Sequence, residues 1–376
     1  MFSVTLCNAI DVYMAEQLVA IFKSSPTSVK NIDLKDDLDF STQALPVPFG
    51  VKSDGSCVPF RGTFNGNGYK IKNLVMDNEE NETYSNAGLF CNMNDTIVEN
   101  LIIDESCNFK GTYAGSVSVQ ATGTVTMRNV INRGRIEATK NLGGLIGEAY
   151  SRGKDDMVTF DHCINEGTIK PSSRSNDLHC SGGLVGYTNC ATVIGCKNTG
   201  SLFGYYVGGL IGFKTSGPGT IENSTNSGLV GGTVAGGLVG YALSLTIIHC
   251  NNTGQVTGFK SSGGLVGDTR KANITDSHNT APIKSRTEAG GLGGFIGSQG
   301  TVINCSNTGD ISASRDAVGG LFGSIAPGSD TFIMDNCKNT GSVVCNSYCG
   351  GLIGKNNTIQ NVTHMSRLRA VPTLGQ

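Results

Sequence analysis

A short phrase that begins with two glycines returns along most of the chain, and it limits the possible folds more than any other feature. The phrase reads Gly-Gly-Leu-Val-Gly at 236–240, and close variants start at residues 143, 182, 208, 263, 293, 319 and 350. Successive copies start 26 to 39 residues apart. Self-similarity at this period indicates a solenoid, in which each unit packs only against its neighbours. The second glycine of each copy defines a set of repeat glycines: Gly144, Gly183, Gly209, Gly237, Gly264, Gly294, Gly320 and Gly351.

A second phrase, most often Cys-x-Asn-Thr-Gly, lies between the glycine phrases and aligns in columns. Its asparagine is present in every copy: Asn132, Asn165, Asn198, Asn226, Asn252, Asn279, Asn307 and Asn339. Two residues earlier, most copies have a small residue that we expect to fill a narrow core, including Cys163, Cys196, Cys250, Cys305 and Cys337. Four residues after the asparagine comes an aliphatic residue, from Ile136 in the first copy to Val343 in the last.

The composition of the repeat selects a fold class. Short runs of β-branched residues, interrupted by Asn-Thr-Gly and Gly-Gly, are typical of strands and turns and not of helices. If each repeat is one turn of a coil, equivalent residues stack about 4.8 Å apart as parallel strands. The asparagine column then predicts a ladder of amide hydrogen bonds, at a bend where Asn and the following Gly also suit a left-handed backbone. Because parallel crossovers are right-handed in about 98% of cases, the sequence predicts an all-β fold, a single-stranded right-handed parallel β-helix of about ten coils.

The first part of the chain differs from the repeats. Residues 14–23 contain good helix formers with an apolar face and predict a short α-helix, and a loop rich in proline and glycine spans 44–59. Because the open end of a stack of strands invites aggregation, we expect this helix to cover it. The predicted division is an N-terminal cap at 1–60, parallel β-helix repeats at 61–362 and a C-terminal tail at 363–376.

Composition excludes some classes of function. The net charge is −2 with no block of like charges, which argues against a nucleic-acid partner. No apolar run is long enough for a membrane span. The N-terminus lacks the pattern of a signal peptide, so the 13 cysteines favour unpaired thiols and an intracellular location. A cell-surface location is the alternative.

The two phrases also carry a family resemblance. Recurring Gly-Leu-x-Gly with Cys-x-Asn-x-Gly resembles the GLUG-motif repeat proteins, and Phe60-Arg-Gly-Thr-Phe-Asn-Gly-Asn-Gly-Tyr-Lys-Ile71 resembles their first coil. The resemblance covers roughly residues 14–362 and implies a right-handed parallel β-helix with an adhesin-like role at a bacterial or protist surface. Some relatives are joined to IgA-specific metallopeptidases. This chain has no His-Glu-x-x-His, so that activity is not carried over.

The sequence offers few candidates for chemistry. Its acidic patches are Asp155, Asp156, Asp161 and Glu166 in the repeats and Asp33, Asp36, Asp37 and Asp39 in the cap. Glycoside hydrolysis needs two acids about 5–10 Å apart, and neither patch aligns with an acid one repeat later. Cys337, Cys345 and Cys349 form the only local cysteine cluster, a minor zinc candidate. We therefore expect no catalytic, cofactor-binding or metal-binding residue, and no cofactor.

The predicted function is a non-catalytic scaffold that binds another protein, a larger assembly or a glycan through loops on a rigid β-helix. The variable segments are 150–160, 170–181 and 324–331, and we favour the 150–181 side as the binding surface. Two alternatives stay open: a carbohydrate-active enzyme of the lyase or glycoside hydrolase kind, and a fragment of an adhesin-type surface protein. Two carboxylates facing one groove on adjacent coils, beside a basic residue, would favour the enzyme. Intact disulfides would favour the adhesin.

Overall fold

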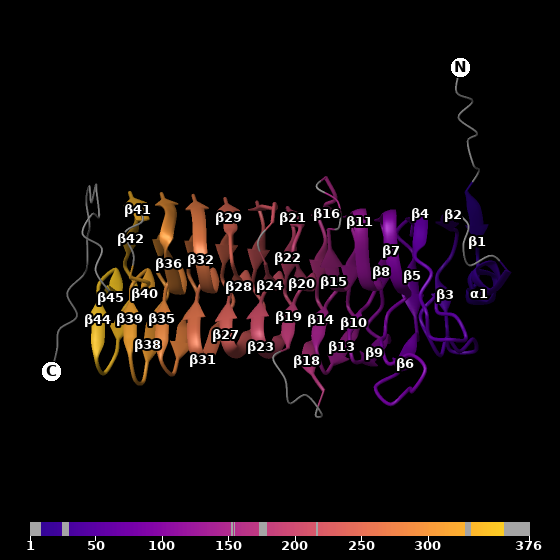
Figure 1. Cartoon of the computed structure of the whole chain (residues 1–376), viewed down its shortest axis with the longest axis horizontal. Helices are drawn as coiled ribbons and strands as arrows, with labels where there is room; N and C mark the ends of the chain where they lie inside the picture. Colours follow the sequence, from indigo (N-terminus) through magenta and orange to yellow (C-terminus); the bar gives the residue numbers. More distant parts are fainter. Residues whose placement is uncertain are drawn as a thin grey trace, which may run out of the picture.

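The computed structural model describes residues 9–24, 30–151, 153, 155–172, 179–215, 217–327 and 332–356. These residues form an all-β parallel solenoid of about 11 turns with one short α-helix, which confirms the predicted fold class. The coils lie side by side along one axis, with α1 (Ala15–Ser24) and β1 (Ile10–Val12) at one end and β44 (Tyr348–Gly350) and β45 (Ile353–Asn356) at the other (Figure 1).

The strands belong to three sheets. The first sheet has 18 strands: β1 (Ile10–Val12), β2 (Lys30–Leu34), β4 (Phe60–Asn65), β7 (Phe90–Glu99), β11 (Ser118–Arg128), β15 (Ile146–Tyr150), β16 (Val158–Asp161), β20 (Val185–Thr188), β21 (Ala191–Ile194), β24 (Ile211–Lys214), β25 (Ile221–Glu222), β28 (Val239–Ala242), β29 (Leu245–Ile248), β32 (Val266–Thr275), β36 (Gly293–Ile303), β40 (Phe322–Ile325), β41 (Phe332–Asp335) and β45 (Ile353–Asn356). The second sheet has 11 strands: β3 (Leu38–Asp39), β5 (Lys70–Lys72), β8 (Ile102–Ile103), β12 (Ile131–Asn132), β17 (Ile164–Asn165), β22 (Lys197–Asn198), β26 (Thr225–Asn226), β30 (Asn251–Asn252), β33 (His278–Asn279), β37 (Ser306–Asn307) and β42 (Lys338–Asn339). The third sheet has 16 strands: β6 (Val75–Asp77), β9 (Asn108–Gly111), β10 (Ala114–Gly115), β13 (Arg135–Ala138), β14 (Asn141–Gly143), β18 (Ile169–Pro171), β19 (Cys180–Gly182), β23 (Leu202–Gly208), β27 (Val230–Gly236), β31 (Val256–Gly263), β34 (Ile283–Ser285), β35 (Glu288–Gly290), β38 (Ile311–Ala313), β39 (Ala317–Gly319), β43 (Val343–Val344) and β44 (Tyr348–Gly350).

Each coil visits the three sheets in the same order. The chain leaves the third sheet through the glycine phrase, enters the first sheet, crosses the second and returns to the third, as in the run from β19 to β23. Residues that share a slot in the repeat pair directly between coils. The aliphatic column, for example, pairs Ile136 with Ile169, Ile169 with Leu202 and Leu202 with Val230, all in parallel strands. The coils are therefore stacked in register.

The asparagine column forms the predicted ladder in the second sheet. Nδ2 of Asn252 donates to Oδ1 of Asn279 at 2.7 Å and to the carbonyl oxygen of Gly254 at 2.9 Å. Oδ1 of Asn252 accepts from Nδ2 of Asn226 at 2.7 Å. The same pattern runs from Asn132 to Asn339, with Nδ2–Oδ1 distances of 2.6 to 2.9 Å. These amides are buried, so the hydrogen bonds between coils replace those with water.

The ladder begins at Asn132 because the preceding coils have apolar residues in this slot. Ile103 pairs with Asn132, Ile71 with Ile103 and Leu38 with Ile71. Oδ1 of Asn132 is consequently buried without a hydrogen-bond donor among the described residues. The N-terminal coils are held together at this position by apolar packing, and the amide stack takes over from Asn132 onward.

The residues with a left-handed backbone are not the ladder asparagines and their following glycines, as the sequence predicts. Positive φ angles of 47° to 61° occur three residues before each ladder asparagine, at Asn129, His162, Gly195, Asn223, His249, Asp276, Asn304 and Asn336. The ladder asparagines and the glycines that follow them are not among the residues with positive φ. Asn, Asp and Gly tolerate this conformation best. The bend between the first and second sheets therefore falls on this earlier column, which leaves the ladder side chains free to point inward.

The glycine phrase is needed for space between coils. A Cβ on Gly144 would collide with the carbonyl oxygen of Gly183 and with the side chain of Asn165. The same argument corrects one predicted repeat glycine. Gly264 stacks on Gly291, and Gly291 on Gly320, so Gly294 does not belong to the column. The true copy of the phrase starts at residue 290, and it was missed because Gly293 stands where other copies have Val, Ile or Phe.

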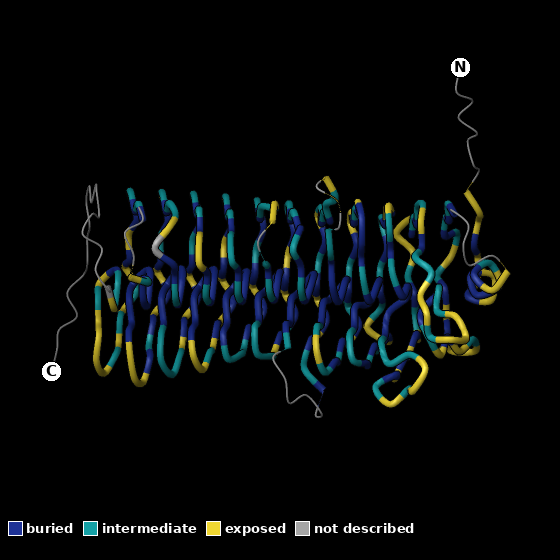
Figure 2. Tube along the Cα trace, in the orientation of Figure 1, coloured by how far each residue is buried: buried dark blue, intermediate teal, exposed yellow. Residues whose placement is uncertain are grey.

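The interior of the coil is a continuous hydrophobic core (Figure 2). The cysteines of the small column are 0 to 3% exposed and lie within it: Cys163, Cys196, Cys250, Cys305 and Cys337. Their thiols donate to main-chain carbonyls of the preceding coil, as from Cys163 to Met127 at 3.3 Å. Free cysteine here acts as a small apolar residue with a weak donor.

The N-terminal end is covered by the helix α1 (Ala15–Ser24). The ring of Phe22 stacks on Phe49 with centroids 4.4 Å apart and contacts Phe60 and Phe90 of the first sheet. Strand β1 pairs with β2, and β2 with β4, so the first sheet already begins inside the predicted cap. The boundary at 60/61 remains a prediction, and the predicted tail at 363–376 lies outside the described residues.

Truncation of a ladder amide should destabilise the fold. Asn252→Ala removes hydrogen bonds to two neighbouring coils and leaves buried polar atoms of Asn226 and Asn279 without partners, so we expect the free energy of unfolding to fall by about 2 to 4 kcal/mol. The matched control is Asn251→Ala, because Asn251 is the exposed neighbour in the same strand. Denaturant melts that show equal losses for both variants would contradict a stabilising role for the ladder.

Candidate functional site

The residues that flank each glycine phrase lie on opposite sides of one corner of the coil, and they range from buried to exposed. The chain turns sharply at the phrase, and the residue two positions before the two glycines meets the residue that follows the phrase. We call these sets the first and second corner columns. The first contains Asn141, Cys180, Tyr206, Val234, Ser261, Glu288, Ala317 and Tyr348. The second contains Glu148, Tyr187, Phe213, Tyr241, Asp268, Phe295, Ser324 and Lys355.

Contacts across the corner show that the two columns line one side of the molecule. Nδ2 of Asn141 donates to Oε1 of Glu148 at 2.6 Å. Farther along, Oγ of Ser324 donates to Oε1 of Glu288 at 2.9 Å. Nζ of Lys355 lies 5.4 Å from the ring centroid of Tyr348. Because these contacts recur from coil to coil, the corner is a continuous strip parallel to the solenoid axis.

An aromatic run occupies the middle of this strip. Tyr187, Phe213 and Tyr241 stand on consecutive coils, with ring centroids 5.5 Å and 4.7 Å apart. Tyr206 in the first corner column meets Phe213 and Tyr241 edge-on at 5.1 Å and 5.5 Å. All four rings are half-buried. The rings are therefore fixed by one another while part of each remains accessible.

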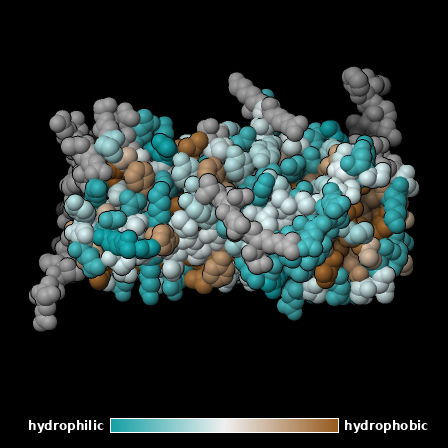
Figure 3. All heavy atoms as spheres, turned by 60° about the horizontal axis from the view of Figure 1, so that its bottom comes forward, coloured by the Kyte–Doolittle hydropathy of each residue, from teal (hydrophilic) through white to brown (hydrophobic). Residues whose placement is uncertain are grey.

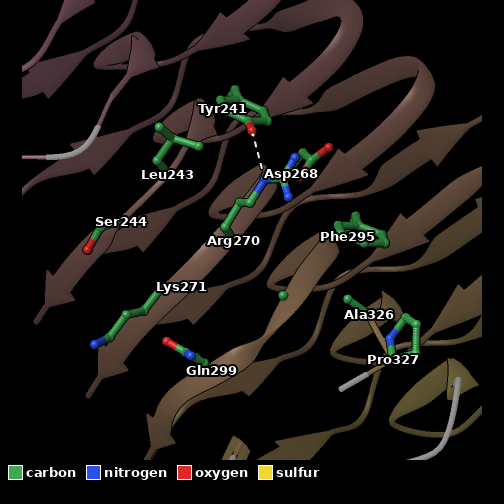
Figure 4. A pocket seen from close by; sticks show the side chains of 11 residues that line it. Tyr241, Leu243, Ser244, Asp268, Arg270, Lys271, Phe295, Gln299, Ala326 and Pro327 are labelled. Carbon is green, nitrogen blue, oxygen red and sulfur yellow. Dashed lines mark hydrogen bonds between the residues drawn. The ribbon is translucent and has the colours of Figure 1, made fainter. Parts of the chain in front are cut away.

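A pocket opens beside the end of the aromatic run (Figure 4). Its volume is about 560 Å³, and its walls come from Tyr241 and Leu243 in one coil, Asp268, Arg270 and Lys271 in the next, and Phe295 and Gln299 in the third. Nε of Arg270 donates to the hydroxyl oxygen of Tyr241 at 3.4 Å. The strand β32 has an irregular register between Thr269 and Lys271, which places Arg270 on the surface.

Two carboxylates of the corner are partly withdrawn from water. Burial raises the pKa of Asp268 to about 6, although the positive charges of Lys260 and Arg270 oppose the shift. Burial also raises the pKa of Glu288, with a further contribution from the negative charge of Asp268. Perturbed carboxyl groups beside a cavity are typical of functional sites.

Acids from both patches named in the sequence form ion pairs between coils. Asp161 pairs with Arg128 at 3.3 Å, and Glu166 pairs with Arg133 at 2.7 Å. In the cap, Asp37 pairs with Lys72 at 2.9 Å. These carboxylates are held by bases on neighbouring coils. The corner acids were missed because they sit beside the glycine phrase, in slots that vary from copy to copy.

The loops proposed as the binding surface are only partly described. Residues 152, 154, 173–178 and 328–331 lie outside the described residues. Ser172 Oγ donates to Oε1 of Glu79, which ties this region to the loop after β6. The 150–181 surface therefore remains a prediction.

Four cysteines form disulfides. Cys57 is joined to Cys91 across neighbouring coils, and Cys345 to Cys349 within one loop. The predicted zinc candidate is thus replaced by a disulfide. Within the described part of the chain, no group of three or more His, Cys, Asp or Glu residues could hold a metal ion. No described helix has the length and apolar character needed to cross a membrane.

Another hollow, of about 450 Å³, lies at the N-terminal end between α1 and the proline-rich loop. Hydrophobic atoms gather near this end of the face drawn in Figure 3. The hollow is lined mainly by apolar residues such as Val19, Phe22 and Pro46, and Lys23 and Lys52 are its charged residues. It lacks the acidic groups found at the corner.

Comparisons with known proteins support the architecture. A crystal structure of a Bacteroides ovatus protein assigned as an immunoglobulin A1 protease superposes with a TM-score of 0.52 at 14% identity, over 73% of this chain and 76% of that one. A structure named IgA1 protease matches 88% of this chain and 21% of its own length, at 15% identity and a TM-score of 0.41. No family model matches the sequence. At these identities the likeness shows the fold alone.

One sequence relative is halomucin of Haloquadratum walsbyi, which is 30% identical over 155 residues. The match covers 38% of this chain, and the chain spans about 2% of the length of halomucin.

The prediction that the chain is not an enzyme is contradicted, because the solved β-solenoid that superposes with a TM-score of 0.52 carries the name of a protease. The fold therefore gives no ground for excluding catalysis. The regularity of the columns had suggested that no residue was left for chemistry. The corner columns lie outside that regularity, because their residues vary from copy to copy.

Replacement of Asp268 should make stability depend less on pH. An acid whose pKa is raised in the folded state binds its proton more tightly there than in the unfolded state, so its contribution to stability is lost as pH rises from about 4 to about 6. We expect Asp268→Asn to raise the free energy of unfolding by about 1 to 3 kcal/mol at pH 8 and to leave it nearly unchanged at about pH 3.5. Urea melts at both pH values measure this difference. A variant that is less stable than the parent protein at pH 8 would contradict the assignment.

Proposed function

We propose that this chain is a rigid β-solenoid module of a surface or secreted protein, and that it binds a neutral glycan along the corner strip. The observation that carries the proposal is the aromatic run of Tyr187, Phe213 and Tyr241, which places one accessible ring on each of three consecutive coils. Coils repeat every 4.8 Å or so, close to the length of one hexose residue in an extended glycan. The strip can therefore offer equivalent contacts to successive sugars.

The chemistry of the strip suits a carbohydrate. Because the three rings stack on one another, they offer a sugar mainly their exposed apolar edges. Carboxylates and phenols exchange hydrogen bonds with sugar hydroxyls. The carboxylates Glu148, Asp268 and Glu288 would repel an anionic polymer, which favours a neutral one. An extended peptide would need an unpaired strand edge, and the strands beside the aromatic run are paired on both sides.

The disulfides support a location outside the reducing cytosol. Cys57–Cys91 and Cys345–Cys349 are the kind of crosslink that persists in secreted and surface proteins. The repeat phrases favour membership of the GLUG-motif group, and an adhesin-type role fits both. The eight free cysteines seen in the structure are all buried, so their thiol state does not argue for the cytosol.

Binding should depend on the aromatic run. Phe213→Ala removes the central ring, and we expect it to weaken binding at least tenfold, about 1.4 kcal/mol, to whichever of cello-, xylo-, manno- or maltohexaose the parent protein binds in isothermal titration calorimetry. Phe203→Ala is the matched control, since Phe203 is 39% exposed in the same coil but lies outside the corner columns. Absence of binding to all four hexasaccharides, or equal weakening by both substitutions, would refute a glycan site at this corner.

A further inference from the structure

Two acids lie on opposite sides of the corner on adjacent coils, where the aromatic run ends, and burial and the negative charge of Asp268 both raise the pKa of Glu288. Asp268 belongs to the second corner column, opposite Ser261 in its own coil. Glu288 pairs in register with Ser261 from the next coil, so it lies one coil beyond Asp268 on the opposite wall. Neither carboxylate forms a salt bridge within the described ranges, whereas Asp37, Asp161 and Glu166 of the acidic patches are paired with bases.

We propose that Asp268 and Glu288 hydrolyse a glycosidic bond of a neutral glycan held along the corner strip. This inference rests on the proposed function, because the aromatic run must first bring the glycan to the acids. It assigns an activity to the strip that binding alone does not require.

The reaction needs one proton donor and one proton acceptor. Asp268 in its acid form gives its proton to the glycosidic oxygen, the bond between that oxygen and the anomeric carbon breaks, and the leaving sugar departs as an alcohol. Glu288 as a carboxylate takes a proton from a water molecule, whose oxygen forms the new bond to the anomeric carbon. The net change is the addition of one water, and both acids return to their starting states by proton exchange with solvent.

The surroundings assign the two roles. Burial raises the pKa of Asp268 to about 6, so a large fraction of this group is still protonated near pH 6. Burial raises the pKa of Glu288, and the hydrogen bond that it accepts from Oγ of Ser324 at 2.9 Å opposes this rise and stabilises the carboxylate form that a base needs. Other titratable and charged groups surround the two acids. Lys260 of β31, Arg270 of β32 and Tyr206 of β23 interact electrostatically with Asp268, and Lys260 and Asp316, which precedes β39, interact with Glu288. Lys271 of β32 and Tyr241 of β28 line the same pocket as Asp268.

The pocket next to Asp268 offers room for the sugar beyond the cleavage point. Its volume of about 560 Å³ exceeds that of one hexose unit, and Arg270, Lys271 and Gln299 on its walls can donate hydrogen bonds to sugar hydroxyls. The pocket begins at Tyr241, the last ring of the aromatic run. A glycan bound on the three rings would therefore continue past Asp268 into this space.

The test is hydrolysis of cello-, xylo-, manno- and maltohexaose labelled at the reducing end, followed by chromatography between pH 4 and pH 8. We expect the parent protein to cleave at least one of them, at a rate that falls as pH rises through about 6. Asp268→Asn and Glu288→Gln should each lower the rate by about a hundredfold or more while the affinity for the same hexasaccharide changes less than threefold. The control is Asp276→Asn in the same coil, at a left-handed position that suits Asn; it should keep the full rate and pH profile.

The outcomes separate this inference from the proposed function. A parent protein that binds a hexasaccharide and cleaves none would overturn the catalytic assignment and leave glycan binding intact. A parent protein that neither binds nor cleaves would overturn both. Cleavage that survives in both acid variants, each shown to be folded by circular dichroism, would place the activity elsewhere and refute the pair. Should Asp268→Asn fail to fold, Glu288→Gln alone decides the question in the same way.

Discussion

The structure depends on the register between coils, and the buried asparagine ladder is the interaction that fixes it. A shift of one residue would place an amide against an aliphatic side chain and leave its hydrogen-bonding groups unpaired, which costs far more than the loss of a single surface contact. Apolar packing in the hydrophobic core is less directional than hydrogen bonding, so the core alone specifies the register less strictly than the amide stack does. The amide stack from Asn132 to Asn339 supplies the missing specificity.

Once the register is fixed, the outer surface becomes a set of columns whose residues are free to vary. The glycine phrase holds each corner at the same angle, since a Cβ at Gly144 or its equivalents would collide with the next coil. The corner columns on either side of the phrase differ from copy to copy: Val234 and Ser261 are buried there, whereas Tyr241 and Asp268 are partly exposed. Tyr187, Phe213 and Tyr241 follow one another there, and Asp268 comes next. A rigid repeat thereby presents a row of side chains whose chemistry changes along its length.

The sequence predicted the regular parts of the molecule well, because period and column composition report directly on stacking. The ladder and the fold class follow from the asparagine column. Gly294 was misplaced because Gly290 to Gly297 contains the phrase in two overlapping frames, and only the pairing of Gly293 with Phe322 shows which one stacks. The column of residues with positive φ was missed because it contains His162 and His249, whereas its other members are Asn, Asp or Gly. The corner site could not be predicted, since Glu288 and Asp268 are 20 residues apart in the sequence and meet only through the fold.

Side-chain amide hydrogen exchange in protein labelled at asparagine is the measurement that tests this account most directly. The account predicts that Nδ2 protons of Asn165, Asn198, Asn226, Asn252, Asn279 and Asn307 exchange slowly, with protection close to that of global unfolding, because each donates to the next coil within the core. The exposed asparagines Asn223, Asn304 and Asn336 should exchange rapidly in the same spectrum. Rapid exchange at the ladder positions would show that the amides are not stacked, and the register on which the corner columns depend would then have no physical basis.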